Sequence, residues 1–213
     1  MPDPTPTDGR RIRGERTRTA VLDAAVRLAS TDGLGGLSLA QLASGLTVSK
    51  SALFTHWPDK QALQLAAVDH AAEQWAEQVV RPALADRTGV RALWALAEHR
   101  LDFYRKPVLP GRCFFVTTQA EFDDHPGPVR DRLRTHLRTW DELTRNLIRQ
   151  AIQAGELNSE TDPALLSYEI DALTGAVVVR SHLLDEDTFA LARTAVLARL
   201  RGLGADPALL PKN

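Results

Sequence analysis

Residues 38–63 read SLAQLASGLTVSKSALFTHWPDKQAL, and the order of residues here predicts two short helices. Ser38 followed three residues later by Gln41 has the form of a capping box, so a short helix is expected to start directly after Ser38. A brief connection at residues 47–48 separates it from a second short helix, residues 50–56. Two short helices joined by so brief a turn are typical of a helix-turn-helix.

A longer helix is expected on each side of this pair. Residues 13–31 carry apolar side chains at helical spacing, and Gly33 follows as a break. Pro58 disfavours helix at the residue before it, and Asp59 is placed to cap a long helix that begins at Lys60. Because that helix continues without a linker into the rest of the chain, it can carry movement from one half to the other.

The third helix of such a motif lies in the major groove of DNA, so its outward side chains must be short and able to hydrogen-bond. The side chains that meet this requirement are Lys50, Ser51, Thr55 and His56, whereas Leu53 and Trp57 are expected to face the core. Ser38 and Lys60 lie at helix starts, where free backbone N–H groups bind phosphate. The alternative is a small three-helix core without a role in DNA binding.

Charge is unevenly distributed along the 213 residues, whose formal net charge is −1. Between Arg10 and Lys60 there are eight Lys or Arg residues and four acids, which gives 8 − 4 = +4. A basic end on a nearly neutral protein indicates one polyanion-binding end, or else an arginine-rich helix start exposed to solvent.

Cys113 is the single cysteine, which excludes an intrachain disulfide and a metal site built on paired thiolates. We expect a small buried side chain here rather than a redox switch. No signal peptide or membrane span is evident, and no cofactor or metal is expected, so the sequence predicts a cytoplasmic protein.

The remainder reads as further helices, which makes the fold class all-α with about nine helices. These are expected at the following places: from Lys60 to near Pro82, about 90–104, 112–122, 129–154, 163–184 and 187–200. We expect a flexible N-terminal arm at 1–12, a helix-turn-helix domain at 13–64 and a ligand-binding and dimerisation domain at 65–213.

The helix at 163–184 carries two apolar stripes on different faces, so it must be buried on more than one side. One stripe is Leu166, Ile170, Leu173 and Val177, and the other is Leu165, Ala172, Ala176 and Val179. Together with the helix at 187–200 it is expected to form a homodimer interface. A central helix in a monomeric bundle is the alternative.

Aromatic residues in the C-terminal half are candidates for a pocket that binds a hydrophobic or aromatic ligand. The candidate ligand-binding residues are Trp75, Trp94, His99, Phe103, Phe115, Phe122, Trp140 and Tyr168. His136 and Glu169 are further polar candidates. For each of these residues a place in the ordinary core is the competing interpretation.

The chain also resembles the TetR family of transcriptional regulators. The resemblance rests on RTAVLDAAVRL at residues 18–28, on Gly33, on SLAQLA at 38–43 and on VSKSALFTHWPDKQAL at 48–63. RCFF at 112–115 and EFDDHPGP at 121–128 resemble the sensor domain of one branch of that family.

The resemblance implies an all-helical homodimer, usually a repressor that a small ligand releases from operator DNA. It places Ser38 and Lys60 on phosphates and adds Ala52 to the groove-facing set. Thr47 stands where the family usually has Gly, Trp57 where it usually has Phe, and Phe54 where it often has a phosphate-binding Tyr. Phe54 is therefore expected to offer van der Waals contact only. The full candidate set for DNA is Ser38, Ser49, Lys50, Ser51, Ala52, Phe54, Thr55, His56 and Lys60.

The sequence leaves two other functions as alternatives. An enzyme is disfavoured because the sequence has no Gly-rich phosphate loop and no G-x-S-x-G elbow. Asp123 and Asp124 beside His125 resemble a metal site, but acids in a proline-rich turn more often cap helices. A non-specific architectural DNA-binding protein, without an effector, is the second alternative.

Overall fold

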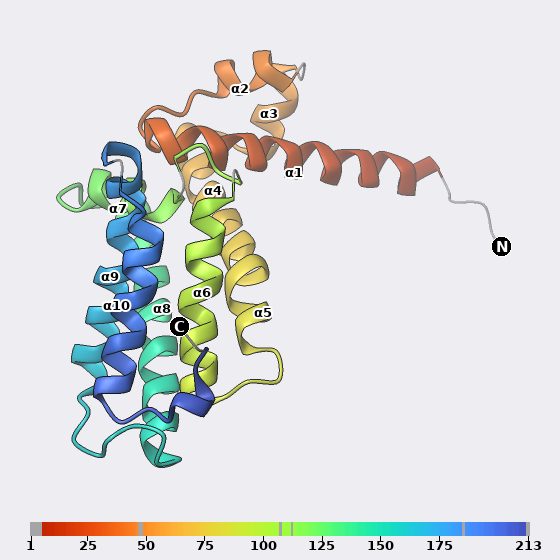
Figure 1. Cartoon of the computed structure of the whole chain (residues 1–213). Coiled ribbons are helices and arrows are strands. Elements are labelled where there is room, and N and C mark those ends of the chain that lie inside the picture. The colour runs from red at the N-terminus through yellow and green to blue at the C-terminus, as the bar shows by residue number, and fades with distance from the viewer. Residues whose placement is uncertain (1–5, 47–48, 107, 112, 185, 212–213) are drawn as a thin grey trace.

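The computed structural model describes residues 6–46, 49–106, 108–111, 113–184 and 186–211. The regular secondary structure in these residues is helical and includes no strand, as the sequence predicts. Three helices form a small layer at one end, and the remaining helices form a bundle beneath it (Figure 1).

The end layer consists of α1 (Pro6–Asp32), α2 (Leu39–Leu46) and α3 (Lys50–His56). The bounds of α3 are those expected from the sequence. In contrast, α1 begins at Pro6, so residues 6–12 are helical where a flexible arm was expected. Proline is well suited to a first helical turn because its φ is fixed near the helical value and its missing N–H is not needed there. The first half of α1 projects away from the body of the molecule (Figure 1).

A single continuous rod joins the two layers. It comprises α4 (Lys60–Trp75), a π-helical turn (Ala76–Val80) and α5 (Arg81–Leu84). Asp59 caps its start as predicted, because its carboxylate accepts from the Ala62 N–H at 2.7 Å. Backbone angles at Ala76 and Arg81 stay helical, so the π turn adds a bulge without breaking the rod. Such bulges often occur at functional sites.

The bundle is completed by α6 (Gly89–Arg105), α7 (Phe114–Phe122), α8 (Pro128–Gln153), α9 (Pro163–Leu183) and α10 (Thr188–Gly202), followed by a 3-10 turn (Pro207–Leu209). Asp162 caps α9, since its carboxylate accepts from the N–H of Ala164 at 2.8 Å. Start and end residues agree with the expected ones within a few positions. α7 starts at Phe114 because Cys113 is extended, with φ −139°.

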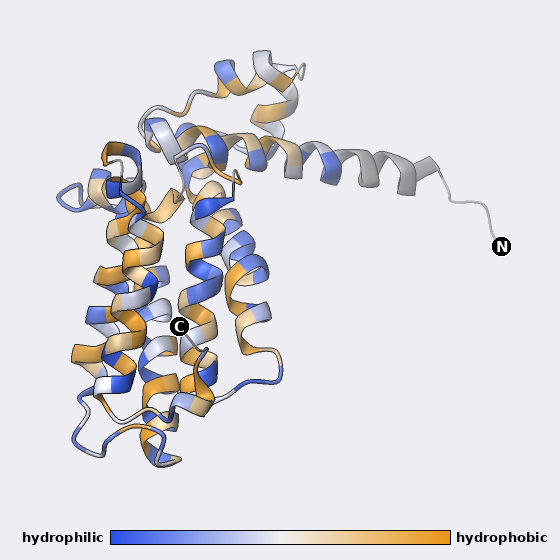
Figure 2. Ribbon diagram, in the orientation of Figure 1, coloured by the Kyte–Doolittle hydropathy of each residue, from blue (hydrophilic) through white to orange (hydrophobic). Residues whose placement is uncertain are grey.

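The two apolar stripes of α9 have different fates. Leu166, Ile170 and Val177 are buried within the chain, whereas Leu165 and Val179 are 51% and 55% exposed. Apolar segments also lie along the side of α9 and α10 where no other helix covers them (Figure 2). Other large apolar side chains exposed on these helices are Tyr168, Leu183 and Leu191. One face of α9 thus serves the core, and the other is left uncovered in the single chain.

Among the described helices, none combines the length and apolar character that crossing a bilayer requires.

Candidate functional site

The outward face of α3 carries small polar side chains. Ser51, Thr55 and His56 are exposed, while Leu53 and Trp57 are buried in the three-helix core, as predicted. This division follows from the helical period, which separates the two sets by roughly half a turn. Local hydrogen bonds order the face: the Thr55 hydroxyl donates to the Ser51 carbonyl oxygen at 2.9 Å, and the hydroxyls of Ser49 and Ser51 lie 3.1 Å apart.

The other candidates for DNA contact lie close to this face. Ser49 is exposed just before α3, and Phe54 is 50% exposed on it. Ser38 is partly buried at the start of α2. The side chains of Lys50 and Ala52 lie outside the described residues.

Lys60 has a partner within the chain. Its ammonium group donates to the carbonyl oxygen of Gly35, in the loop between α1 and α2. An ammonium has three donors and Lys60 is exposed, so a phosphate contact remains compatible with this bond.

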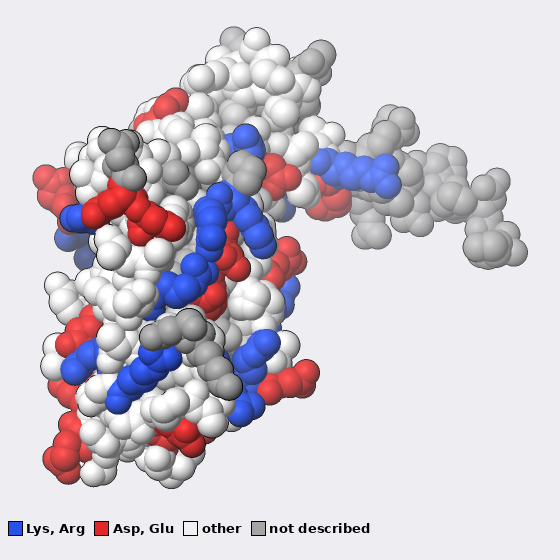
Figure 3. All heavy atoms as spheres, viewed as in Figure 1, with Lys and Arg blue, Asp and Glu red and all other residues white. Residues whose placement is uncertain are grey.

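Charged side chains are sparse on the visible surface around α2 and α3. On the face shown in Figure 3, acidic and basic residues are interspersed over the bundle, whereas the region of α2 and α3 is mostly uncharged. Base edges are read by hydrogen bonds, which neutral hydroxyls supply as well as charged groups do.

Glu121, near the end of α7, binds the α1–α2 loop with both carboxylate oxygens. Its Oε2 accepts from the Leu34 N–H at 2.6 Å and its Oε1 from the Gly35 N–H at 2.6 Å. Gln64 of α4 donates to the Leu34 carbonyl oxygen at 2.9 Å. The loop is therefore held from the bundle through α7 and from the long rod through Lys60 and Gln64.

A second set of contacts ties the same part of the bundle to the end of α1. The Thr117 hydroxyl donates to the Ser30 carbonyl oxygen at 2.9 Å, and the Gly111 N–H donates to the Ser30 hydroxyl at 3.1 Å. A Cβ at position 111 would lie 1.7 Å from the Ser30 carbonyl oxygen, so this close approach requires glycine. Arg27 adds a bond to the Val108 carbonyl oxygen at 2.8 Å.

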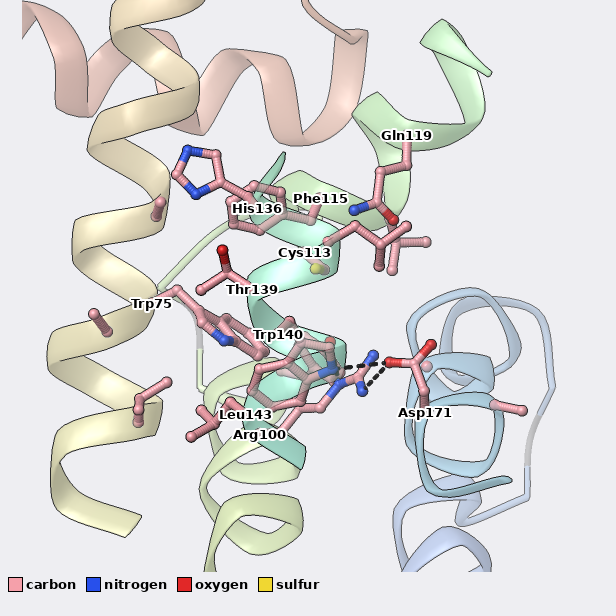
Figure 4. A pocket seen from close by; sticks show the side chains of 18 of the residues that line it. Trp75, Arg100, Cys113, Phe115, Gln119, His136, Thr139, Trp140, Leu143 and Asp171 are labelled. Carbon is pink, nitrogen blue, oxygen red and sulfur yellow. Dashed lines mark hydrogen bonds and ion pairs between the residues drawn. The ribbon is translucent and has the colours of Figure 1, made fainter. Parts of the chain in front are cut away.

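A cavity of about 490 Å³ lies within the bundle. It is bounded by α4, the π turn, α6, α7, α8 and α9, and Figure 4 shows its side chains converging from these elements. Its aromatic walls are Trp75, Phe115 and Trp140, with Trp75 and Trp140 in edge-to-face contact at 5.4 Å between ring centroids. Such a space suits a small planar molecule.

Arg100 and Asp171 form the charged part of the cavity wall. Their charged groups approach to 2.6 Å, and the indole N–H of Trp140 donates to the same Asp171 oxygen at 3.2 Å (Figure 4). Arg100 Nε also donates to the Tyr104 hydroxyl at 2.7 Å. Burial alone would lower the pKa of Arg100, but the Tyr104 and Asp171 oxygens more than offset this and raise it. Arg100 is therefore a permanent cation.

Burial raises the pKa of the Tyr104 hydroxyl well above its ordinary value and also raises the pKa of the Cys113 thiol. Both groups are thus neutral near pH 7. Cys113 is buried at the cavity wall, as expected for a small apolar side chain.

His136 links the cavity to α4. Its Nε2 lies 3.2 Å from an Asp69 carboxylate oxygen, and Arg132 contacts the other oxygen of the same group. The ring of His136 also faces that of Phe115 across the cavity end, with centroids 6.1 Å apart.

The sequence candidates for the ligand divide into two groups. Trp75, Phe115 and Trp140 line the cavity, and so does His136. The others lie elsewhere: Trp94 and His99 line an outer depression of α6, Phe103 is buried against Trp75, Phe122 is partly buried beside His125, Tyr168 is 73% exposed on α9, and Glu169 pairs with Arg199.

Arg100 and Asp171 were not identified as cavity residues from the sequence. Arg100 shares one face of its helix with Ala97 and Tyr104, both of which are buried, and a charge among apolar neighbours was a usable signal. Asp171 offered no such signal, because acids are common on helix surfaces.

Asp124 and His125 are exposed, with 2.9 Å between Oδ1 of Asp124 and Nδ1 of His125. Among the residues that the structure describes, no group of three His, Cys, Asp or Glu side chains is arranged to hold a metal ion.

Comparison with known proteins agrees with this architecture. Residues 21–67 match the family of bacterial regulatory proteins of the tetR type, and residues 89–196 match the tetracyclin repressor-like C-terminal domain. A comparison with curated proteins finds no match.

Solved structures of regulators have the same fold. A TetR transcriptional regulator from Chloroflexus aurantiacus is 26% identical with a TM-score of 0.81, and the match covers 89% of this chain and 96% of that one. AibR, solved in complex with isovaleryl coenzyme A and operator DNA, is 20% identical with a TM-score of 0.66, covering 86% and 97%. A regulator from Saccharomonospora viridis in complex with choline is 19% identical with a TM-score of 0.73, covering 88% and 96%.

The two family matches together span both layers of the molecule, the helix-turn-helix at one end and the helical bundle with its cavity. The chain belongs to the TetR family of bacterial transcriptional regulators.

Proposed function

We propose that this protein is a repressor that binds a quasi-palindromic operator as a homodimer and is released by a small aromatic or hydrophobic ligand. The observation that carries the first part is the outward face of α3. Ser51, Thr55 and His56 are exposed there on a helix whose inner side chains, Leu53 and Trp57, are locked in a core. A rigid helix with short polar side chains suits the major groove.

The uncovered face of α9 and α10 supports the homodimer. Leu165 near the start of α9 is 51% exposed, and Val179 and Leu183 near its end are 55% and 76% exposed. Several large apolar side chains exposed along one helix mark an association surface. Two subunits joined here would present two α3 helices, which must lie about 34 Å apart to enter successive major grooves.

The two faces of α7 support the link between ligand and DNA. Phe115 and Gln119 line the cavity, whereas Thr117 and Glu121 bind the end of α1 and the α1–α2 loop. A ligand that displaces α7 therefore moves the helix-turn-helix directly. Trp75 gives the ligand a second contact, on the rod that begins at Lys60. A ligand that tilts this rod would therefore also move the helix-turn-helix. Loss of operator affinity then follows by linkage.

Two of the solved relatives bind a small molecule, and one of these also binds operator DNA. AibR was solved with a coenzyme A thioester and operator DNA, and the regulator from Saccharomonospora viridis with choline. They support a small-molecule effector in general. Its chemical class has to be inferred from the side chains that line this cavity.

Selection of DNA from a random duplex pool by the purified protein tests the proposal. We expect enrichment of one motif with two related half-sites about one helical turn apart. Lys50→Ala should weaken binding to that motif, because Lys50 is expected to contact a guanine or a phosphate. Arg149→Ala is the matched control, since it removes one positive charge from an exposed ion pair with Glu142 at the far end of α8. If Lys50→Ala binds as tightly as the control, the assignment of α3 to the groove is wrong.

The alternative of a non-specific architectural protein makes a different prediction in the same experiment. Such a protein would recover the pool without sequence enrichment. The presence of a cavity of about 490 Å³ with aromatic walls favours the effector-controlled regulator.

A further inference from the structure

The charges that face the cavity cancel. Among the lining residues that the structure describes, Arg100 and Asp171 are the ones with formal charges, and they contact each other at 2.6 Å. His136, Tyr104 and Cys113 are the other titratable groups on the wall, and Asp69 lies behind His136 in contact with Arg132. The cavity thus contains an ion pair rather than an unpaired charge.

Arg100 already has a counter-ion in the protein, the Asp171 carboxylate. Its side chain is 7% exposed, its Nη1 and Nε donate to Asp171 and Tyr104, and its guanidinium carbon lies 5.6 Å and 5.3 Å from the ring centroids of Tyr104 and Trp140. A ligand carboxylate would have to displace Asp171 or approach it as a like charge. Neither arrangement compensates the desolvation of the ligand's charge.

A cationic ligand meets the opposite difficulty. It would gain the Asp171 carboxylate, but the Arg100 guanidinium lies 2.6 Å from that group and repels a second cation. A ligand without net charge avoids both costs.

Asp171 nonetheless offers a hydrogen-bond acceptor. Its side chain is 46% exposed, in contrast to that of Arg100. The side-chain contacts described for this carboxylate, from Arg100 and from Trp140, both end on Oδ1. Within the described residues, Oδ2 has no side-chain donor.

We propose that the effector of this cavity is an aromatic molecule without net charge, one that donates a hydrogen bond to Asp171 and stacks among Trp75, Phe115 and Trp140. The inference rests on the proposed effector role of the cavity and specifies the class of ligand.

Isothermal titration calorimetry with four probes of one shape tests it, with full-length protein at pH 7 and no DNA. The probes are 2-naphthol, 2-methoxynaphthalene, 2-naphthoate and 2-naphthylmethylammonium. We expect 2-naphthol to bind at least about tenfold more tightly than either ion, a difference of about 1.4 kcal/mol. The methoxy compound should bind more weakly than 2-naphthol because it has no donor for Asp171.

Asp171→Asn provides the second arm. It keeps the shape of the side chain but leaves Arg100 as an unpaired cation, so the preference should invert and 2-naphthoate should bind more tightly than 2-naphthol. Glu169→Gln is the matched control, because it removes an acid from the same helix. Glu169 pairs with Arg199, with 2.6 Å between the charged atoms, and does not line the cavity. The control should keep the preference for 2-naphthol.

The inference is overturned if the unaltered protein binds either ion as tightly as 2-naphthol, or if it binds no probe at all. These results do not depend on the Asp171→Asn variant, so a variant that fails to fold leaves the test intact. Because no DNA is present, the calorimetric result is independent of the result of operator selection. A protein that enriches no DNA motif contradicts the proposed function, whatever its preference among the probes.

Discussion

Replacing Glu121 by Ala should loosen the joint between the bundle and the helix-turn-helix. The side chain accepts two hydrogen bonds, from the N–H groups of Leu34 and Gly35, both at 2.6 Å. Truncation removes both acceptors at once. Leu34 is buried, so water cannot readily replace the carboxylate at its N–H.

The size of the effect follows from these two bonds. A hydrogen bond to a charged group contributes about 1.5–3 kcal/mol when its partner is buried, and less when water can substitute. With one buried and one exposed N–H, the free energy of unfolding should fall by about 2–4 kcal/mol. Glu121→Gln should be nearly as harmful, because its carboxamide offers one acceptor oxygen and turns its NH₂ group toward the second N–H.

Urea unfolding followed by circular dichroism measures this loss, at one fixed protein concentration because the proposed dimer would make stability concentration-dependent. Glu156→Ala is the matched control. Glu156 accepts from the Val90 N–H at 2.7 Å, a bond of the same kind that lies within the bundle. We expect both alanine variants to be destabilised, but only Glu121→Ala to lose operator affinity as well. If Glu121→Ala is as stable as the unaltered protein, or binds operator as tightly as Glu156→Ala, the coupling through α7 is refuted.

Three further changes have defined outcomes. Gly111→Ala should lower stability by about 1–3 kcal/mol in urea unfolding, because the new Cβ overlaps the Ser30 carbonyl oxygen; an unchanged midpoint would contradict the close approach. Leu183→Glu should shift the protein from dimer to monomer in analytical ultracentrifugation and weaken operator binding, since Leu183 is 76% exposed on the apolar face of α9; a dimer that persists would place the interface elsewhere. Stability should also fall as the pH rises above about 8.5, because the pKa of Cys113 is raised in the folded state and the unfolded chain loses this proton first. Cys113→Ala should flatten that decline above about pH 8.5, and an equally steep curve would show that the thiol stays accessible.

The helices were predictable because the residues that start and end them act locally. Asp59 before Lys60 and Asp162 before Pro163 mark helix starts by capping chemistry, which requires no tertiary information. The early start of α1 was missed because the polar residues before Arg13 have no apolar stripe. A helix there does not need one, since it projects from the body of the molecule.

The cavity was only partly predictable, because its walls depend on how helices rotate against one another. Trp75 and Trp140 are aromatic residues at helical spacing and line the cavity. Trp94 and Phe103 have the same pattern in the sequence, but they lie on faces of α6 that do not line it. Asp171 shows the limit most clearly. A surface acid and a cavity acid look alike in sequence until packing brings Arg100 beside one of them.

The coupling through Glu121 was equally invisible in the sequence. Its partners are backbone N–H groups 86 and 87 residues away, and every residue type except proline supplies those. Spacing and composition carry no information about such a bond.

Competition between specific and bulk DNA is the sharpest measure of the proposed operator binding. A labelled duplex carrying the selected operator is displaced by unlabelled operator or by a scrambled duplex of equal length and composition, at one salt concentration. We expect the operator to compete at least about 10³-fold better than the scrambled duplex. Equal competition by both duplexes, from a folded protein free of ligand, would contradict the proposed operator binding.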